Sequence, residues 1–337
     1  MKYERLGTSD LEVSRICLGC MSYGDSAWRP WILEEDAARE HFKRAFELGI
    51  NFFDTADMYS HGASERTTGK LLRELAPRDE YVLASKVFFP VAEGSTQGGL
   101  SRDYILSACE DSLSRLGLDH IDLYQIHRWD HATPVEETLE ALDLLVRDGK
   151  VRYLGASSMA AWQLSMALYT AGERSWHRFV SMQNHYNLLY REEEREMIPL
   201  CIDQGVGLLP WSPLARGLLT GSRTREDRHA TTRAQADPFA DRWYSRDEDF
   251  QVVDVLLEVS EERGDSPAAV ALAWILSVPG ITSPIIGSTR VEHIAEAVRA
   301  VDLEMTAEEI ERLEAAYKPN SVRGHEQPTP RNMAPSQ

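Results

Sequence analysis

Four side chains at the ends of apolar runs, or within them, have types that could carry out acid–base chemistry together. Asp54 and Tyr59 belong to NFFDTADMYS, in which an apolar stretch ends on a carboxylate and a phenol soon follows. Lys86 interrupts the apolar run YVLASKVFF, and His127 stands near the end of IDLYQIHR. A lysine within a buried strand is costly unless it is paired, and Asp54 is the natural partner. Taken alone, Asp54 could instead cap a strand before an ordinary turn.

These four side chains could deliver a proton to an oxygen atom that gains negative charge. A phenol has an ordinary pKa near ~10, which is too high for efficient proton transfer at neutral pH. A neighbouring ammonium stabilises the phenolate, so Lys86 should lower the pKa of Tyr59. His127 could donate a hydrogen bond to a carbonyl oxygen and orient it. Because no side chain supplies a hydride, a reduction at this site would require a cofactor.

The elements that must position these residues alternate along the chain. Eight short apolar runs have the character of strands: RICLGCM, GINFFDTAD, YVLASKVFF, IDLYQIHR, VRYLGASS, FVSMQNHYNLL, VGLLPWSPLA and ITSPIIGS. Amphipathic stretches lie between them, and several end at a glycine typical of helix C-termini, namely Gly49, Gly117, Gly149 and Gly205. Apolar strands separated by helices predict a parallel sheet covered by helices. Eight such units predict an α/β fold, a single (β/α)₈ TIM barrel. An open doubly wound sheet is the alternative, but the G-x-G-x-x-G fingerprint after an early strand is missing.

Three segments lie outside the eight units. YERLGTSDLEVSR predicts an N-terminal hairpin that closes one end of the barrel. Residues 216–246 form a long basic and polar loop after the seventh strand, and long loops of this kind are typically lids or linkers. We expect one domain over residues 1–320, with loosely ordered chain from Pro319 onward and a tail at 321–337.

Composition and charge exclude several classes of partner. The chain has 36 basic and 54 acidic side chains and a net charge of −18, so it repels nucleic acids and anionic membrane surfaces. No apolar stretch has the length of a membrane span or the pattern of a signal peptide. The four cysteines, Cys17, Cys20, Cys109 and Cys201, include one CLGC pair without a second pair that would complete a zinc site. We therefore expect no metal and predict buried free thiols in a cytoplasmic protein.

Seven motifs, in order along the chain, resemble the aldo-keto reductase superfamily. They are FFDTADMY, ASK, LYQIHRWD, GASS, SMQNHYNLL, PWSPLARGLLTG and PIIGSTR, and the similarity covers nearly the whole chain. It is closest to the bacterial YajO-type members, which are related to the potassium-channel β subunits. The resemblance implies a (β/α)₈ barrel that reduces aldehydes or ketones to alcohols with NADPH. It further implies a catalytic tetrad of Asp54, Tyr59, Lys86 and His127, with the proton supplied by Tyr59.

The same resemblance implies a cofactor site at the strand ends. Ser157 and Gln183 would bind the nicotinamide carboxamide, Trp211 would stack on its ring, and the backbone from Ser212 to Gly217 would follow the pyrophosphate. Residues 287–290 would hold the adenosine 2′-phosphate, as expected of the last two loops of such a barrel. The full set implied for cofactor binding is Cys20, Met21, Asp54, Ser157, Ser158, Gln183, Trp211, Ser212, Pro213, Leu214, Arg216, Gly217, Gly287, Ser288, Thr289, Arg290, His293 and Glu296.

Some positions differ from the common pattern of that family. Ser158 and Ala297 replace asparagines, and His293 replaces an arginine near the adenosine phosphate. These differences concern the strength of cofactor binding rather than the reaction. The arginines of the 216–246 loop, Arg223, Arg225 and Arg228, would lie over the dinucleotide. The aromatic residues near strand ends, which could line a pocket for a small carbonyl substrate, are Trp28, Trp31, Phe88, Phe89, Trp129 and Tyr186.

Two other functions remain open from the sequence, as does the oligomeric state. The first is a cofactor-binding regulatory subunit with weak or no turnover. The channel β subunits often lack the histidine that His127 supplies here, so catalysis is favoured. The second is a metal-dependent barrel hydrolase, which usually carries H-x-H on its first strand, and RICLGCM contains no histidine.

Overall fold

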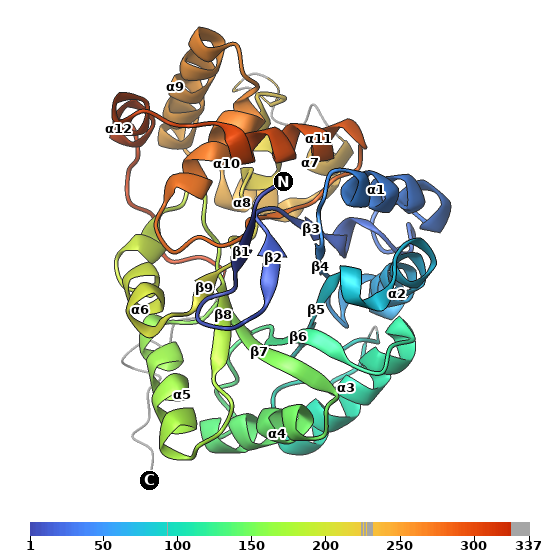
Figure 1. Cartoon of the computed structure of the whole chain (residues 1–337). Coiled ribbons are helices and arrows are strands. Elements are labelled where there is room, and N and C mark those ends of the chain that lie inside the picture. The colour runs from blue at the N-terminus through green and yellow to red at the C-terminus, as the bar shows by residue number, and fades with distance from the viewer. Residues whose placement is uncertain (93, 224, 226, 228–231, 325–337) are drawn as a thin grey trace.

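The protein is built around a ring of parallel strands with helices on the outside (Figure 1). Its structure is a computed structural model that describes residues 1–92, 94–223, 225, 227 and 232–324. The sheet has the order β10-β3-β4-β5-β6-β7-β8-β9, and every neighbouring pair is parallel. Parallel bridges join Leu208 to Ile281 and Trp211 to Ile285, which brings the two ends of the sheet together. The predicted (β/α)₈ barrel is confirmed.

The strands of the barrel are short and buried. They are β3 (Cys17–Gly19), β4 (Phe52–Asp54), β5 (Val82–Val87), β6 (Ile121–Ile126), β7 (Val151–Ser157), β8 (Phe179–Gln183), β9 (Gly207–Leu208) and β10 (Ile285–Ile286). Every residue of β5 and β6 is buried, which is why these strands read as apolar runs without alternation. Two of their polar residues, Lys86 and Gln125, are paired across the β5–β6 register.

Helices cover the outside of the barrel. They are α1 (Glu35–Glu47), α2 (Ala63–Leu75), α3 (Arg102–Leu116), α4 (Val135–Arg147), α5 (Ala161–Glu173), α6 (Met197–Gln204), α9 (Asp247–Arg263), α10 (Pro267–Ser277), α11 (Glu292–Arg299) and α12 (Ala307–Ala315). The predicted terminating glycines are confirmed: Gly117 and Gly205 adopt left-handed φ values of 66° and 65° directly after α3 and α6. In the described chain, no helix is long and apolar enough to cross a membrane.

The N-terminal hairpin closes one end of the barrel, as predicted. Its strands β1 (Tyr3–Arg5) and β2 (Glu12–Ser14) pair in antiparallel fashion. Leu6 and Val13 belong to the same buried apolar cluster as Phe52 and Leu123 of the barrel strands. The hairpin therefore fills the N-terminal end of the barrel and leaves the C-terminal ends of the strands for the site.

Two segments are more ordered than the sequence suggested. The loop over 216–246 contains part of the 3₁₀ segment Ala215–Thr220 and two short helices, α7 (Thr232–Ala236) and α8 (Pro238–Trp243). The expectation of loose chain after Pro319 is wrong as far as Gly324. The Asn320 amide donates to the carbonyl of Leu189 at 3.0 Å, and the backbone N–H of Arg323 donates to the Tyr190 hydroxyl at 2.9 Å.

A buried carboxylate links α2 and α3 to strand β5. Glu65 is fully buried, and one of its oxygens accepts the Ser85 hydroxyl at 2.5 Å while the other meets Arg115 Nε at 2.6 Å. A buried carboxylate without its cation is strongly destabilising. The pair therefore fixes two helices against the strand that carries Lys86.

This pair generates a first prediction. Arg115→Met should lower the free energy of unfolding by about 3–5 kcal/mol, because Glu65 would keep its charge without a cation. The measurement is urea unfolding followed by circular dichroism. Arg102→Met is the matched control at the start of the same helix. Arg102 meets Asp103 at 3.9 Å on the exposed surface, and such pairs contribute little. Equal small losses in both variants would contradict the assignment.

Candidate active site

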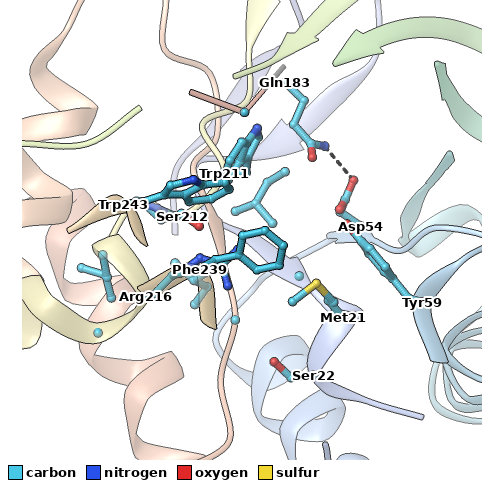
Figure 2. Close-up of a pocket in the computed structure, with 18 of the residues that line it drawn as sticks. Met21, Ser22, Asp54, Tyr59, Gln183, Trp211, Ser212, Arg216, Phe239 and Trp243 are labelled. Carbon is cyan, nitrogen blue, oxygen red and sulfur yellow. Dashed lines mark hydrogen bonds between the residues drawn. The ribbon is translucent and has the colours of Figure 1, made fainter. Parts of the chain in front are cut away.

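A large cavity opens at the C-terminal ends of the barrel strands (Figure 2). Its volume is about 1620 Å³, which exceeds the ~300–1,000 Å³ typical of a pocket for one drug-sized ligand. Figure 2 shows Asp54 and Tyr59 across the cavity from Trp211, Arg216 and Trp243. This volume has room for an extended ligand and a second small molecule together.

An ion pair between β4 and β5 forms the floor of the site. Lys86 is fully buried, and its Nζ lies 2.5 Å from Asp54 Oδ1 and 2.8 Å from the carbonyl oxygen of Thr55. The other Asp54 oxygen accepts amide N–H groups from Gln125 at 3.0 Å and Gln183 at 2.9 Å. The pairing expected from the sequence is present, and neighbouring amides complete the hydrogen bonding of the carboxylate.

Lys86 also reaches the phenol of Tyr59. Its Nζ lies 3.3 Å from the Tyr59 hydroxyl oxygen. Burial by itself would lower the pKa of the Lys86 ammonium, but Asp54 and Tyr59 outweigh that effect and the pKa is raised. Burial raises the pKa of Tyr59 above its ordinary value, and Lys86 only moderates the rise. The sequence-based expectation of a lowered pKa for Tyr59 is therefore wrong, because desolvation dominates.

His127 lies beside Tyr59 as a neutral imidazole. The two ring centroids are 5.8 Å apart in an edge-on arrangement. Burial, followed by the charges of Arg128 and Lys86, lowers the pKa of His127 well below its ordinary value. A neutral imidazole still carries one N–H and can donate a hydrogen bond to an oxygen placed between it and the phenol.

The chain after Tyr59 adopts an unusual conformation. Ser60 and His61 have positive φ values of 49° and 51°, and Gly62 follows at 82°. Left-handed non-glycine residues are uncommon and are retained where the surroundings enforce them. A nearby hydrogen-bonded chain provides such surroundings, since Thr55 bonds Ser64 at 2.9 Å and Ser64 donates to the carbonyl of Cys20 at 2.8 Å.

On the opposite side, Trp211 is fixed by a stack of rings. His185 lies between Trp211 and Tyr190, with centroid separations of 4.3 Å to each. The indole N–H of Trp211 donates to the Ser158 hydroxyl at 3.0 Å. Since one indole face is covered by His185, the ring is held rigidly at the cavity wall.

The rest of the cavity is strongly basic. Among the described residues its lining contains two carboxylates, Asp54 and Glu296, of which Asp54 is paired with Lys86. Against them stand six arginines: Arg29, Arg128, Arg216, Arg242, Arg290 and Arg323. An acidic protein with such a cavity has donors suited to an anionic ligand. Together with the volume and the indole wall, this donor set fits a nicotinamide dinucleotide.

The structure brings nearly all of the residues expected at the site together. Asp54, Tyr59 and His127 line the cavity, and Lys86 lies directly behind them. Of the residues expected to bind the cofactor, all line the cavity except Cys20, whose buried thiol faces the carbonyl of Leu18 at 3.5 Å. Contrary to the prediction that Cys20 contacts the cofactor, its side chain is not at the cavity surface.

One predicted aromatic residue and two predicted loop arginines do not line the cavity. Tyr186 is buried away from the cavity, where it stacks on Trp274 and donates to Glu194 at 2.5 Å. The other five expected aromatic residues, Trp28, Trp31, Phe88, Phe89 and Trp129, line the cavity. Arg225 forms an ion pair with Asp254 on α9 at 2.8 Å and, like Arg223, is not part of the lining, while Arg228 lies outside the described residues.

Several lining residues were not anticipated from the sequence. Arg29 and Arg128 are single polar residues in loops and carry no motif of their own. Phe239 and Trp243 come from helix α8, within the long loop over 216–246, and residues 321–324 come from the presumed tail. Of these residues, only Arg128 could have been predicted from the sequence to line the site, because it directly follows His127 at a strand end. No group of three or more His, Cys, Asp or Glu among the described residues could hold a metal ion.

Comparison with known proteins identifies the family of the chain. Residues 15–318 match the model of the aldo/keto reductase family. The chain is 43% identical to versiconal hemiacetal acetate reductase of Aspergillus parasiticus over 343 residues, which cover 96% of this chain and 98% of the relative. It is 42% identical to a putative aryl-alcohol dehydrogenase of Schizosaccharomyces pombe, with 96% and 97% covered, and 42% identical to the aldo-keto reductase AMT2 of Alternaria alternata, with 96% and 93% covered. The chain belongs to the aldo/keto reductase family.

Proposed function

We propose that this oxidoreductase reduces aldehydes or ketones to alcohols with NADPH and takes the proton from Tyr59. The observation that carries the proposal is the buried Lys86, which contacts both Asp54 and Tyr59 at the edge of an arginine-rich cavity. The names of two relatives, a reductase and a putative aryl-alcohol dehydrogenase, support a reaction between carbonyl compounds and alcohols.

In the proposed reaction the carbonyl oxygen of the substrate lies between Tyr59 and His127. When bound, the reduced nicotinamide supplies the hydride to the carbonyl carbon. Tyr59 keeps its proton at neutral pH, as any phenol does. Burial raises its pKa, and Lys86 opposes that rise, so the contact with Lys86 favours release of the proton. Neutral His127 orients the oxygen by a hydrogen bond. Lys86 stabilises the phenolate that remains, and Asp54 keeps Lys86 in place.

The choice of NADPH rests on the loop after β10. Ser288, Thr289, Arg290 and His293 line the same end of the cavity and offer hydroxyl, guanidinium and imidazole donors. The Arg290 side chain is 70% exposed and 3.9 Å from Glu292, so it is free to turn toward a phosphate. Within the family, we propose closeness to the YajO-type members, on the motifs given above. Four free buried thiols support a reducing, cytoplasmic location.

The experiment that tests the function is a titration with NADPH followed by turnover of benzaldehyde. A cofactor-binding regulatory subunit would bind NADPH without appreciable turnover, and a protein of another class would not bind it. We expect both binding and reduction.

The second prediction concerns the acid. Tyr59→Phe should lower kcat by about 10²-fold or more and leave NADPH binding nearly unchanged, because only the proton donor is lost. The measurements are steady-state reduction of benzaldehyde and NADPH titration by fluorescence. Normal turnover in this variant would exclude Tyr59 as the acid.

The third prediction concerns the ion pair. Lys86→Met should inactivate the enzyme and lower the free energy of unfolding by about 3–5 kcal/mol, because Asp54 would stay buried without a cation. Unfolding in urea and benzaldehyde turnover are measured together. Lys70→Met, which removes a surface lysine on α2, is the control and should change neither quantity appreciably. A stable and active Lys86→Met variant would be incompatible with the proposed role.

The fourth prediction concerns cofactor selectivity. Arg290→Ala should weaken NADPH binding by roughly ten- to a hundredfold and leave NADH binding almost unchanged, because NADH has no 2′-phosphate. The dissociation constants of both cofactors are measured for each protein. Arg299→Ala, at the end of the helix α11 that follows Arg290 and outside the cavity lining, is the control. Equal losses for both cofactors would mean that the phosphate is held elsewhere.

A further inference from the structure

Arg128 is a charged group at the site that the proposed chemistry does not use. It follows β6 directly after His127 and lines the cavity. One guanidinium nitrogen donates to the carbonyl of His127 at 2.5 Å, which leaves the other N–H groups of a five-donor fork available. The guanidinium carbon lies 5.6 Å from the centre of the Phe89 ring, and that ring meets His127 edge-on at 5.0 Å. The Phe89 ring therefore contacts both the Arg128 guanidinium and the His127 imidazole.

This guanidinium has no counter-ion in the described part of the chain. Arg216 in the same cavity pairs with Asp237, whereas no carboxylate lies within ion-pair distance of Arg128 in residues 1–92, 94–223, 225, 227 and 232–324. Burial lowers the pKa of Arg128 to about 10, with Tyr59 as the only opposing influence. A partly buried cation without a partner is unfavourable, and a ligand anion would relieve that cost.

An effect on the acid alone does not account for this residue. Lys86 already supplies a cation 3.3 Å from the Tyr59 oxygen. Arg128 also lowers the pKa of His127, but burial contributes more to that decrease, so Arg128 is not needed to keep the imidazole neutral. Arg128 lines the same cavity as Tyr59 and His127, so a substrate held beside those two residues could also reach its guanidinium.

The cavity that Arg128 lines has several aromatic walls. Trp28, Phe88, Phe89 and Trp129 line the cavity, and the Trp28 ring lies 6.5 Å from the Tyr59 ring. Flat apolar walls favour a flat substrate, and a planar fork of N–H groups matches a carboxylate in two-point contact. The cation and the aromatic walls together favour one class of substrate, which is flat and carries a carboxylate.

We infer that Arg128 selects aromatic aldehydes or ketones that carry a carboxylate on the ring, by pairing with that carboxylate while the carbonyl meets Tyr59 and His127. This inference rests on the proposed function and names its substrate class. Arg128 is a binding residue for one end of the substrate and takes no part in the transfer of the proton.

The fifth prediction compares a charged substrate with its neutral isostere. The substrates are 3- and 4-carboxybenzaldehyde and the corresponding formylbenzamides, reduced by wild type, Arg128→Met and Arg128→Lys. For at least one carboxylate isomer, kcat/KM should fall about ten- to a hundredfold in Arg128→Met through a rise in KM, with partial recovery in Arg128→Lys. The amides should change less than about threefold. The loss caused by the substitution is compared between each carboxylate and its matching amide, so differences in the intrinsic reactivity of the aldehydes cancel.

Controls separate the alternatives. Arg102→Met removes the same charge outside the cavity lining and should leave the ratio of carboxylate to amide unchanged. Equal losses for carboxylates and amides would mean that Arg128 acts on Tyr59 or His127, and a weaker NADPH titration would mean that it binds the cofactor. Either result, or no loss at all, overturns the inference.

A binding measurement distinguishes failure of this inference from failure of the proposed function. The alcohol product 4-(hydroxymethyl)benzoate and its 3-isomer are titrated in the presence of NADP⁺, with tryptophan fluorescence as the readout. Wild type should bind at least one of them about ten- to a hundredfold more tightly than Arg128→Met does. If wild type did not reduce benzaldehyde, the proposed function would fail, and these titrations would still decide whether Arg128 holds a carboxylate.

Discussion

The buried ion pair between Asp54 and Lys86 is the constraint around which the site is arranged. Each partner would be unfavourable alone in the interior, so neither can be present without the other. The pair is completed by Gln125 and Gln183, and these four residues come from β4, β5, β6 and β8. The hydrogen bonds of one carboxylate thus depend on four strands lying in register within one sheet. The apolar plug of the N-terminal hairpin and the pairing of Glu65 with Arg115 both help to keep those strands in place.

The distribution of charge follows from a second constraint, which is that an acidic protein must admit an anion. The chain carries a net charge of −18, yet arginines outnumber carboxylates in the cavity lining, and Lys86 neutralises Asp54. Most of these arginines follow barrel strands, whereas Arg242 lies on α8 and Arg323 near the end of the described chain. Arg216 is oriented by its pairing with Asp237. The positive potential in the cavity is therefore local. It must come from basic groups close to the ligand, because the net charge of the protein is negative and repels an anion. It also means that any arginine left without a partner in the cavity, as Arg128 is among the described residues, is available to a ligand.

Much of the barrel and the acid–base cluster could be predicted from the sequence, because both leave marks in short segments. Apolar runs mark strands, and a lysine within such a run requires a partner on a neighbouring strand, which is how Lys86 pointed to Asp54. The pKa of Tyr59 was predicted in the wrong direction, since the effect of Lys86 is visible in a sequence and the depth of burial is not. Cys20 and Tyr186 were misplaced because neighbouring residues in a loop or strand can face opposite ways. Phe239, Trp243 and residues 321–324 reach the cavity through tertiary folding of a loop and a tail, for which no local pattern exists.

Gln183 connects the two halves of the site through opposite ends of one residue. Its side-chain amide donates to Asp54, which holds Lys86 and through it Tyr59. Its backbone carbonyl accepts the hydroxyl of Ser157 at 3.0 Å and the N–H of Ser158 at 3.1 Å, and Ser158 in turn fixes the indole of Trp211. In the proposed reaction, hydride and proton must reach adjacent atoms of one carbonyl group, so their donors need a fixed separation. A single strand end that contacts both groups sets this separation through covalent geometry and short hydrogen bonds. The ring stack of Tyr190, His185 and Trp211 then limits how far the wall on the nicotinamide side could move relative to the phenol.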